Sequence, residues 1–132
     1  MNPADLEVLT RLDRGETVVV RLPPLYQPYG PLLHHLRNAG RLVRIDRRTM
    51  WGNPFPLRRG ATETERAAMI ARYRAWLAGD GPDEQTVGGR TFDRNLVLTR
   101  LPELRGKALA CHCTPLACHG DVLAELARKV AP

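Results

Sequence analysis

Short apolar runs alternate with helical segments from one end of this chain to the other. A run such as Val18-Val19-Val20 is continuous and β-branched, which is typical of a buried strand. Parallel strands need crossover connections, and helices usually supply them. The alternation therefore predicts one domain of the α/β class, a three-layer sandwich with a small, mostly parallel sheet. We expect strands at residues 18–20, 42–46 and 107–112, and helices at residues 3–14, 31–39, 62–78, 93–101 and 121–130.

Local signals mark where several of these elements begin and end. Asn2-Pro3 predicts an N-cap followed by proline at the first helical position. Thr62 and Glu65 have the spacing of a capping box. Residues 80–91 follow a glycine- and proline-rich stop and are expected to form a loop. The inward face of the helix that begins after Thr62 is expected to carry Ala67, Ile70, Tyr73, Trp76 and Leu77.

Composition narrows the class of protein. The 132 residues are 43% hydrophobic, which is enough for a single core. The sequence has no run of apolar residues long enough to span a membrane, and MNPADLEVL is not a secretory signal. We therefore expect a cytoplasmic protein that does not associate with membranes. In that compartment, clustered cysteines indicate metal binding or catalysis rather than disulfides.

The charge indicates a class of partner. The formal net charge is +6, and all but two of the twenty basic residues are arginine. Guanidinium groups bind phosphate oxygens bidentately, so nucleotides or nucleic acids are expected partners. The alternative is that a GC-rich genome encodes most cations as arginine. The charge by itself predicts nothing about the fold.

The stretch ACHCTPLACHGDVL, residues 110–123, contains all three cysteines and two of the four histidines. Thiolates and imidazoles are preferred zinc ligands, and four of them close a tetrahedral structural site. In an extended strand Cys111 and Cys113 share a face but lie about 6–7 Å apart, so the backbone would have to curl at His112 to bring both sulfurs to one ion. The candidate zinc ligands are Cys111, Cys113, Cys118 and His119.

The same stretch also fits a reactive-thiol site. It leaves a strand and enters a helix, and the free N–H groups of a helix N-terminus lower thiol pKa values and bind anions. Cys118, His119 and Asp121 are the candidate catalytic residues there, and Gly120 permits close backbone approach to a ligand. Two plainer interpretations stay open. Free cysteines are often simply buried, and an acid such as Asp121 is favoured in any first helical turn.

A second loop, WGNPF at residues 51–55, places two aromatic residues in a tight turn among arginines. Aromatic rings with arginine can stack a base and hold a phosphate, and an asparagine amide can bond a base edge. The alternative is a turn packed by its own side chains, with Trp51 and Phe55 in the core. The candidate ligand contacts are Trp51, Asn53, Gly120 and the flanking arginines Arg47, Arg48 and Arg58; Arg59 also flanks the turn.

The two loops together resemble the signature of a known family. WGNPF, then ARYRAWL, then LPELRGKALACHCTPLACHGDVLAELA follow one another as in the bacterial and phage family called domain of unknown function 4326. Its hallmarks are a KWGNPF-type turn and a CWC-x-P-x-x-CHGD-type C-terminus. The chain departs from them at Met50, where lysine or another polar residue is common, and at His112, where an aromatic residue is usual. The matching motif positions are Trp51, Asn53, Cys111, Cys113, Cys118, His119, Gly120 and Asp121.

The resemblance covers about residues 42–130. It implies a core domain at residues 42–132, with residues 1–41 as a helix-strand-helix extension packed on it. The C-terminal motif is also similar to the CxE…CHR turn of the family called domain of unknown function 488, which implies a Rossmann-like scaffold. Neither family brings an established reaction. Because members of such phage and bacterial families are associated with nucleotide or nucleic-acid metabolism, the resemblance implies a role of that kind.

Ligands of open α/β sheets bind beyond the carboxyl ends of the strands, and both loops follow a strand. We therefore expect one pocket between the WGNPF loop and the helix that begins near Cys118. It would take a nucleotide, a nucleoside or a related phosphorylated ligand, as an enzyme or as a binding domain. One alternative is a zinc-stabilised basic module that binds nucleic acid without catalysis, with an affinity that falls steeply with salt. Another is an accessory protein with a buried cysteine cluster.

Overall fold

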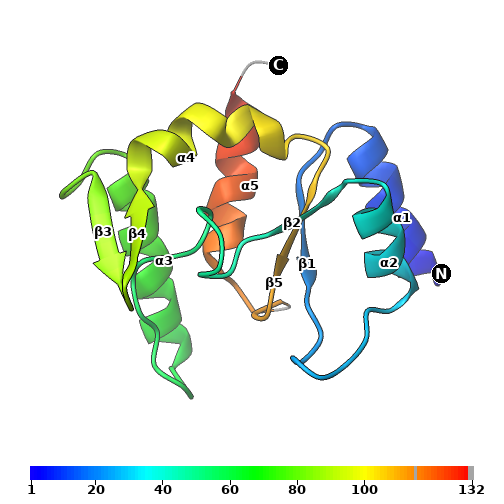
Figure 1. The fold of residues 1–132 in the computed structure, drawn as a ribbon, viewed down its shortest axis with the longest axis horizontal. Coiled ribbons are helices and arrows are strands. Elements are labelled where there is room, and N and C mark those ends of the chain that lie inside the picture. Colours follow the sequence, from blue (N-terminus) through cyan, green and yellow to red (C-terminus); the bar gives the residue numbers. More distant parts are fainter. Residues whose placement is uncertain (115, 131–132) are drawn as a thin grey trace.

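The central element of the fold is a three-stranded parallel sheet (Figure 1). The computed structural model describes residues 1–114 and 116–130. The strand order is β1-β5-β2, with β1 at Val18–Arg21, β5 at Ala108–Cys111 and β2 at Leu42–Arg44. The predicted α/β class and small parallel sheet are confirmed. The predicted strand at 42–46 is shorter in the structure, because the chain turns at Asp46, just after the Ile45 N–H donates to the backbone oxygen of Ala110 at 3.0 Å.

Helices cover both faces of the sheet and make the domain three-layered (Figure 1). On one face, α1 (Pro3–Asp13) and α2 (Pro31–Asn38) pack against Ala108 and Ala110 of the central strand. On the other, α3 (Glu63–Leu77) and α5 (His119–Lys129) form a second core with Leu109 and Cys111. Successive side chains of a strand point to opposite faces. The central strand β5 therefore serves both cores, and all four of its residues are buried.

The N-terminal segment is part of the sheet itself. Strand β1 pairs with β5 along its whole length, from Val18 beside Ala108 to Arg21 beside Cys111. Helices α1 and α2 flank this strand in the helix-strand-helix order expected for residues 1–41. These residues therefore supply an edge strand of the sheet. Because β1 is parallel to β5, it ends at Arg21 on the same side as the carboxyl end of β5.

The predicted helix starts are confirmed, with one shift. Asn2 with Asp5 and Thr62 with Glu65 both form reciprocal capping boxes. The last helix begins at His119, two residues before the predicted start, because Cys118 acts as its N-cap. The predicted inward face of α3 is wrong at Ala67, which is exposed. The buried side chains of α3 are Met69, Tyr73, Trp76 and Leu77.

The predicted loop at residues 80–91 is wrong. An antiparallel hairpin occupies most of it, with β3 at Glu84–Val87 and β4 at Arg90–Asp93. Its strands are mostly exposed, so the apolar alternation that marks a strand is weak there. The Gly88-Gly89 pair at the tip, a typical two-residue hairpin turn, was the available signal.

The hairpin leads directly into α4 (Arg94–Arg100), which confirms the predicted helix, and a 3-10 turn at Leu101–Leu104 then leads to β5. The buried Arg94 donates a hydrogen bond to the backbone oxygen of Trp76 at 2.9 Å and so ties the hairpin to α3. In the described part of the chain, no helix has both the length and the apolar character needed to cross a bilayer.

Candidate functional site

The carboxyl ends of β2 and β5 open onto a pocket of about 260 Å³. Its lining residues come from segments 45–47, 53–57 and 111–119, together with Met69 of α3. The WGNPF loop and the cysteine stretch, far apart in the sequence, therefore face one another across this space. Parallel strands place their carboxyl ends at one edge of the sheet, which is where both loops begin.

The shape of the WGNPF loop is fixed by its own contacts. The Oδ1 of Asn53 accepts a hydrogen bond from the Phe55 backbone N–H at 3.0 Å, and its Nδ2 donates to the sulfur of Met69. Arg47 Nε donates to the backbone oxygen of Asn53 at 2.9 Å. Gly52 has no room for a side chain, since a Cβ would lie 2.7 Å from Arg47 Cα. Asn53 thus lines the pocket with its amide already engaged.

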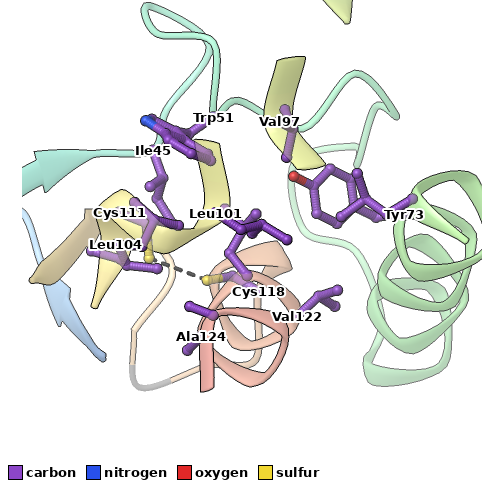
Figure 2. Close-up of a cluster of buried hydrophobic side chains, with 14 of the residues drawn as sticks. Ile45, Trp51, Tyr73, Val97, Leu101, Leu104, Cys111, Cys118, Val122 and Ala124 are labelled. Carbon is purple, nitrogen blue, oxygen red and sulfur yellow. Dashed lines mark hydrogen bonds between the residues drawn. The ribbon is translucent and has the colours of Figure 1, made fainter. Parts of the chain in front are cut away.

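The aromatic residues of this loop belong to the core. Trp51 is only 5% exposed and is not among the residues that line the pocket (Figure 2). Phe55 lines the pocket and meets Trp76 edge-on, with ring centroids 6.0 Å apart. The guanidinium of Arg72 covers the Phe55 ring, 4.3 Å from its centroid. The alternative interpretation, a turn packed by its own side chains, therefore fits the structure. The predicted ligand contact by Trp51 has no support from this geometry.

The arginines that flank the turn are not brought together. Arg47 is exposed and lines the pocket, whereas Arg48 is exposed outside the lining residues. Arg58 makes a bidentate pair with Glu65 of α3, and this hydrogen bonding lowers the pKa of Glu65 to about 2. Arg47 is therefore the predicted arginine that the structure places at the pocket.

The N-terminus of α5 is closed by a capping box that uses a thiol. The Cys118 Sγ accepts a hydrogen bond from the Gly120 N–H at 3.3 Å, and Asp121 Oδ2 accepts one from the Cys118 N–H at 3.0 Å. A Cβ on Gly120 would lie 2.6 Å from the side chain of Ile45. Glycine at this position therefore allows the helix end to pack against the end of β2.

The three predicted catalytic residues do not all line the same pocket. Cys118 and His119 line the pocket, while Asp121 caps the helix and lines a separate cavity of about 350 Å³ near Arg11 and Arg128. The capping interpretation of Asp121 accounts for its position, because an acid in the first turn bonds free N–H groups and opposes the helix dipole. His112 is exposed and lines the same pocket as Cys118 and His119.

Two of the thiols are in direct contact. The sulfur atoms of Cys111 and Cys118 lie 3.3 Å apart (Figure 2), and both residues line the pocket. Both residues are buried, and Cys113 beside them is half-buried. Hydrogen bonds from the Cys113 and Cys118 thiols lower the pKa of Cys111, whereas the neighbouring Cys111 raises the pKa of Cys118. The cluster therefore favours one thiolate, on Cys111, next to a protonated thiol.

His119 connects both loops through one ring nitrogen. Its Nε2 lies 2.8 Å from the backbone oxygen of Ile45 and 3.0 Å from that of Trp51. Both partners are acceptors, so Nε2 carries the proton and Nδ1 is the unprotonated nitrogen of the neutral ring. Burial lowers the pKa of His119 and so favours that neutral form. The ring packs edge-on against Tyr73, with centroids 5.2 Å apart.

Asp46 is a site residue that the sequence reasoning did not single out. It lines the pocket immediately after β2, and its Oδ2 accepts a hydrogen bond from Arg44 at 2.6 Å. Its Oδ1 is buried and has no hydrogen-bond partner in the described residues. A buried acceptor without a partner is costly, and Nε of Arg44 is likewise buried without a partner, so the unsatisfied donor and acceptor belong to one ion pair. The available signal was a carboxylate at the carboxyl end of a strand.

The groups that could hold a metal ion are the three thiols and Nδ1 of His119. Across residues 1–114 and 116–130, no three or more His, Cys, Asp or Glu side chains are arranged to bind one ion. Zinc bound by Cys111, Cys113, Cys118 and His119 stays a prediction.

Comparisons with known proteins agree with the placement of the motifs. The family model described as Domain of unknown function (DUF4326) matches residues 34–129, which include both pocket loops and strands β2 and β5. No curated protein and no solved structure matches the chain.

Proposed function

The chain belongs to the family described as domain of unknown function 4326, and we propose that its pocket binds a nucleoside, a nucleotide or a related phosphorylated ligand. The observation that carries the proposal is that both family motifs line one pocket with two different walls. One wall is apolar, with Phe55, Leu57 and Met69, and suits the face of a ring. The other carries thiols and His119, which suit chemistry or polar recognition.

The size of the pocket indicates that it encloses only part of such a ligand. About 260 Å³ is slightly below the range of about 300–1,000 Å³ that encloses a drug-sized ligand. It suits one ring system, the base or the sugar, with the phosphate outside. The exposed Arg47 at the rim can form charge-assisted hydrogen bonds to that phosphate, with Arg48 next to it in the chain.

We assign any reaction at this site to the thiols and His119. Nδ1 of the neutral imidazole can accept a proton, and the thiolate at Cys111 can attack an electrophilic carbon. Asp121 acts through the helix end, since its carboxylate holds the Cys118 N–H and not a pocket group.

Isothermal titration of the full chain with a panel of nucleosides and their 5′-monophosphates tests the proposal. We expect at least one monophosphate to bind about tenfold more tightly than its nucleoside, a difference of about 1.4 kcal/mol. Arg47→Ala should remove that difference. The matched control is Arg90→Ala, because Arg90 is also exposed but lies on the hairpin strand β4 and is not among the residues that line the pocket.

Two outcomes contradict the proposal. In one, no member of the panel binds better than inorganic phosphate does. In the other, only polymeric nucleic acid binds, with an affinity that falls steeply as salt rises. The second outcome supports the alternative of a basic nucleic-acid-binding module, which the net charge of +6 favours.

A further inference from the structure

We propose that Cys111 and Cys118 form a peroxide-reactive thiol pair that closes to a reversible disulfide in the lining of the pocket. The inference goes beyond ligand binding and does not depend on which ligand the pocket takes. It rests on the contact between the two sulfurs, their access to a small oxidant and the chemistry around them.

The geometry leaves little movement between the thiol pair and a bond. The two sulfurs lie 3.3 Å apart, and a disulfide bond is about 2.05 Å long, so they need to approach by about 1.3 Å. Cys111 is the last residue of β5, and Cys118 precedes the first residue of α5. Side-chain rotation at the ends of these elements can supply such a shift without moving the sheet.

The limited access to the two sulfurs favours a small oxidant. Cys111 is 3% exposed and Cys118 is 1% exposed, so a bulky disulfide or a partner protein cannot reach the sulfurs directly. Both residues line the pocket of about 260 Å³. That space is several times the roughly 30 Å³ occupied by one water molecule, so it admits hydrogen peroxide. A small uncharged peroxide therefore fits this access better than a larger oxidant.

The cluster provides both groups that the reaction needs. Thiolate is the reactive form of cysteine, and the Cys111 sulfur has two possible hydrogen-bond donors beside it, the Thr114 hydroxyl at 3.5 Å and the Cys118 thiol at 3.3 Å. Cys118, whose sulfur lies 3.3 Å from that of Cys111, serves as the resolving thiol. The Gly120 N–H bonded to Cys118 Sγ can support negative charge on that sulfur as its proton leaves.

The chemistry balances in two steps. The Cys111 thiolate attacks one oxygen of hydrogen peroxide, the O–O bond breaks, and the products are a sulfenic acid on Cys111 and hydroxide, which takes a proton to become water. The Cys118 sulfur then attacks the Cys111 sulfur. The S–S bond forms, the S–O bond breaks, and the leaving hydroxide takes the Cys118 proton as water. Two thiols are oxidised, one peroxide is reduced to two waters, and an added dithiol reverses the bond by exchange.

Peroxide treatment of the folded, full-length protein tests the proposal. After treatment the remaining thiols are alkylated and counted by mass spectrometry, before and after reduction with dithiothreitol. We expect two of the three thiols to disappear, the mass to fall by two hydrogens and dithiothreitol to restore all three thiols. Cleavage after Leu116 separates Cys118 from the other two cysteines and shows whether a disulfide joins the two peptides.

Serine variants identify the partners. Cys113→Ser is the matched control, and it should still form the disulfide. Cys111→Ser and Cys118→Ser have the same number of thiols as this control but should form none. Serine is a favourable N-cap, so Cys118→Ser is expected to keep the start of α5 intact, and circular dichroism checks that each variant is folded.

Three results would overturn the proposal. The folded wild-type protein could keep three alkylatable thiols after peroxide treatment. The disulfide could join Cys113 to either neighbour, so that Cys113→Ser abolishes it. A stoichiometric metal ion in the purified protein could shield all three thiols from peroxide.

Discussion

The two loops that face each other across the pocket are built in opposite ways. In the WGNPF loop the polar side chain of Asn53 is engaged on both sides, and Gly52 is packed against backbone. In the cysteine stretch the Cys111 and Cys118 sulfurs contact each other, and His119 keeps an unprotonated Nδ1. The first loop shapes the pocket, and the second supplies its reactive groups.

The difference follows from what a buried polar group does when it meets a ligand. A group that already has its hydrogen bonds must lose one to gain another, so its net contribution to binding is small. The unprotonated Nδ1 of His119 has no hydrogen bond within the described residues and so has no such loss. Substitutions in the WGNPF loop should therefore change stability most, and substitutions in the cysteine stretch should change chemistry most.

The largest expected effect is that of Gly52→Ala. Its Cβ would lie 2.7 Å from Arg47 Cα and 2.9 Å from the Asp46 backbone oxygen, neither of which can move aside as a side chain can. We expect a loss of about 3 kcal/mol in the free energy of unfolding, at the upper end of overpacking costs. Urea unfolding measures it. The control is Gly30→Ala, where a Cβ meets nothing within 4 Å. Equal stability of the two variants would contradict the structural role proposed for the WGNPF loop.

The next effect is that of Asn53→Ala. It leaves the Phe55 N–H buried without its acceptor, which costs about 1–3 kcal/mol. Asn38→Ala, an exposed position in α2, should cost far less. Urea unfolding and nucleotide titration of both variants separate two roles. A variant that keeps its stability but loses nucleotide binding would show that Asn53 contacts the ligand and would contradict the comparison.

A smaller effect concerns pH. Burial lowers the pKa of His119 below its ordinary value of 6.5. Below that pH the unfolded chain binds a proton that the folded chain does not, so the free energy of unfolding should fall as the pH drops from 7 to 5. The slope has an upper limit of about 1.4 kcal/mol per pH unit for one group. Unfolding of His119→Gln, which keeps a side-chain N–H donor, should lack this component, while the exposed His35→Gln should retain it.

The smallest effect is that of Asp121→Ala. It removes the acceptor for the Cys118 N–H and an acid from the first turn of α5, which together cost about 0.5–1 kcal/mol. Thermal unfolding measures the loss, and nucleotide titration should show an affinity close to that of the wild type. A large loss of nucleotide affinity with unchanged stability would contradict this expectation and indicate that Asp121 takes part in the chemistry of the pocket.

The parts of the fold that local signals describe were predictable. The β-branched run at Val18–Val20 and the capping pair Thr62 and Glu65 depend on neighbours within a few residues, and they are confirmed. The β3–β4 hairpin was missed because its strands are mostly exposed. It is held instead by distant contacts, such as Phe92 in the core and the hydrogen bond from Arg94, at the start of α4, to the backbone oxygen of Trp76 in α3.

The same limit applies to the candidate site. The motif residues Cys118 and His119 could be assigned to the end of a strand and the start of a helix, and both line the pocket. The partnerless Oδ1 of Asp46 could not be foreseen, because it depends on how the end of β2 meets loops that are remote in the sequence.

The amino-acid sequence by itself determined the alternation of strands and helices, the helix starts and the two loops that follow strands. These features depend on backbone preference and on side chains a few positions apart. The tertiary structure alone decided which atoms of those loops are available. It buries Trp51, engages Asn53, turns Asp121 to the helix cap and brings the Cys111 and Cys118 sulfurs into contact. The reason is that availability depends on partners that only the packing of α3 and α5 against the sheet brings near.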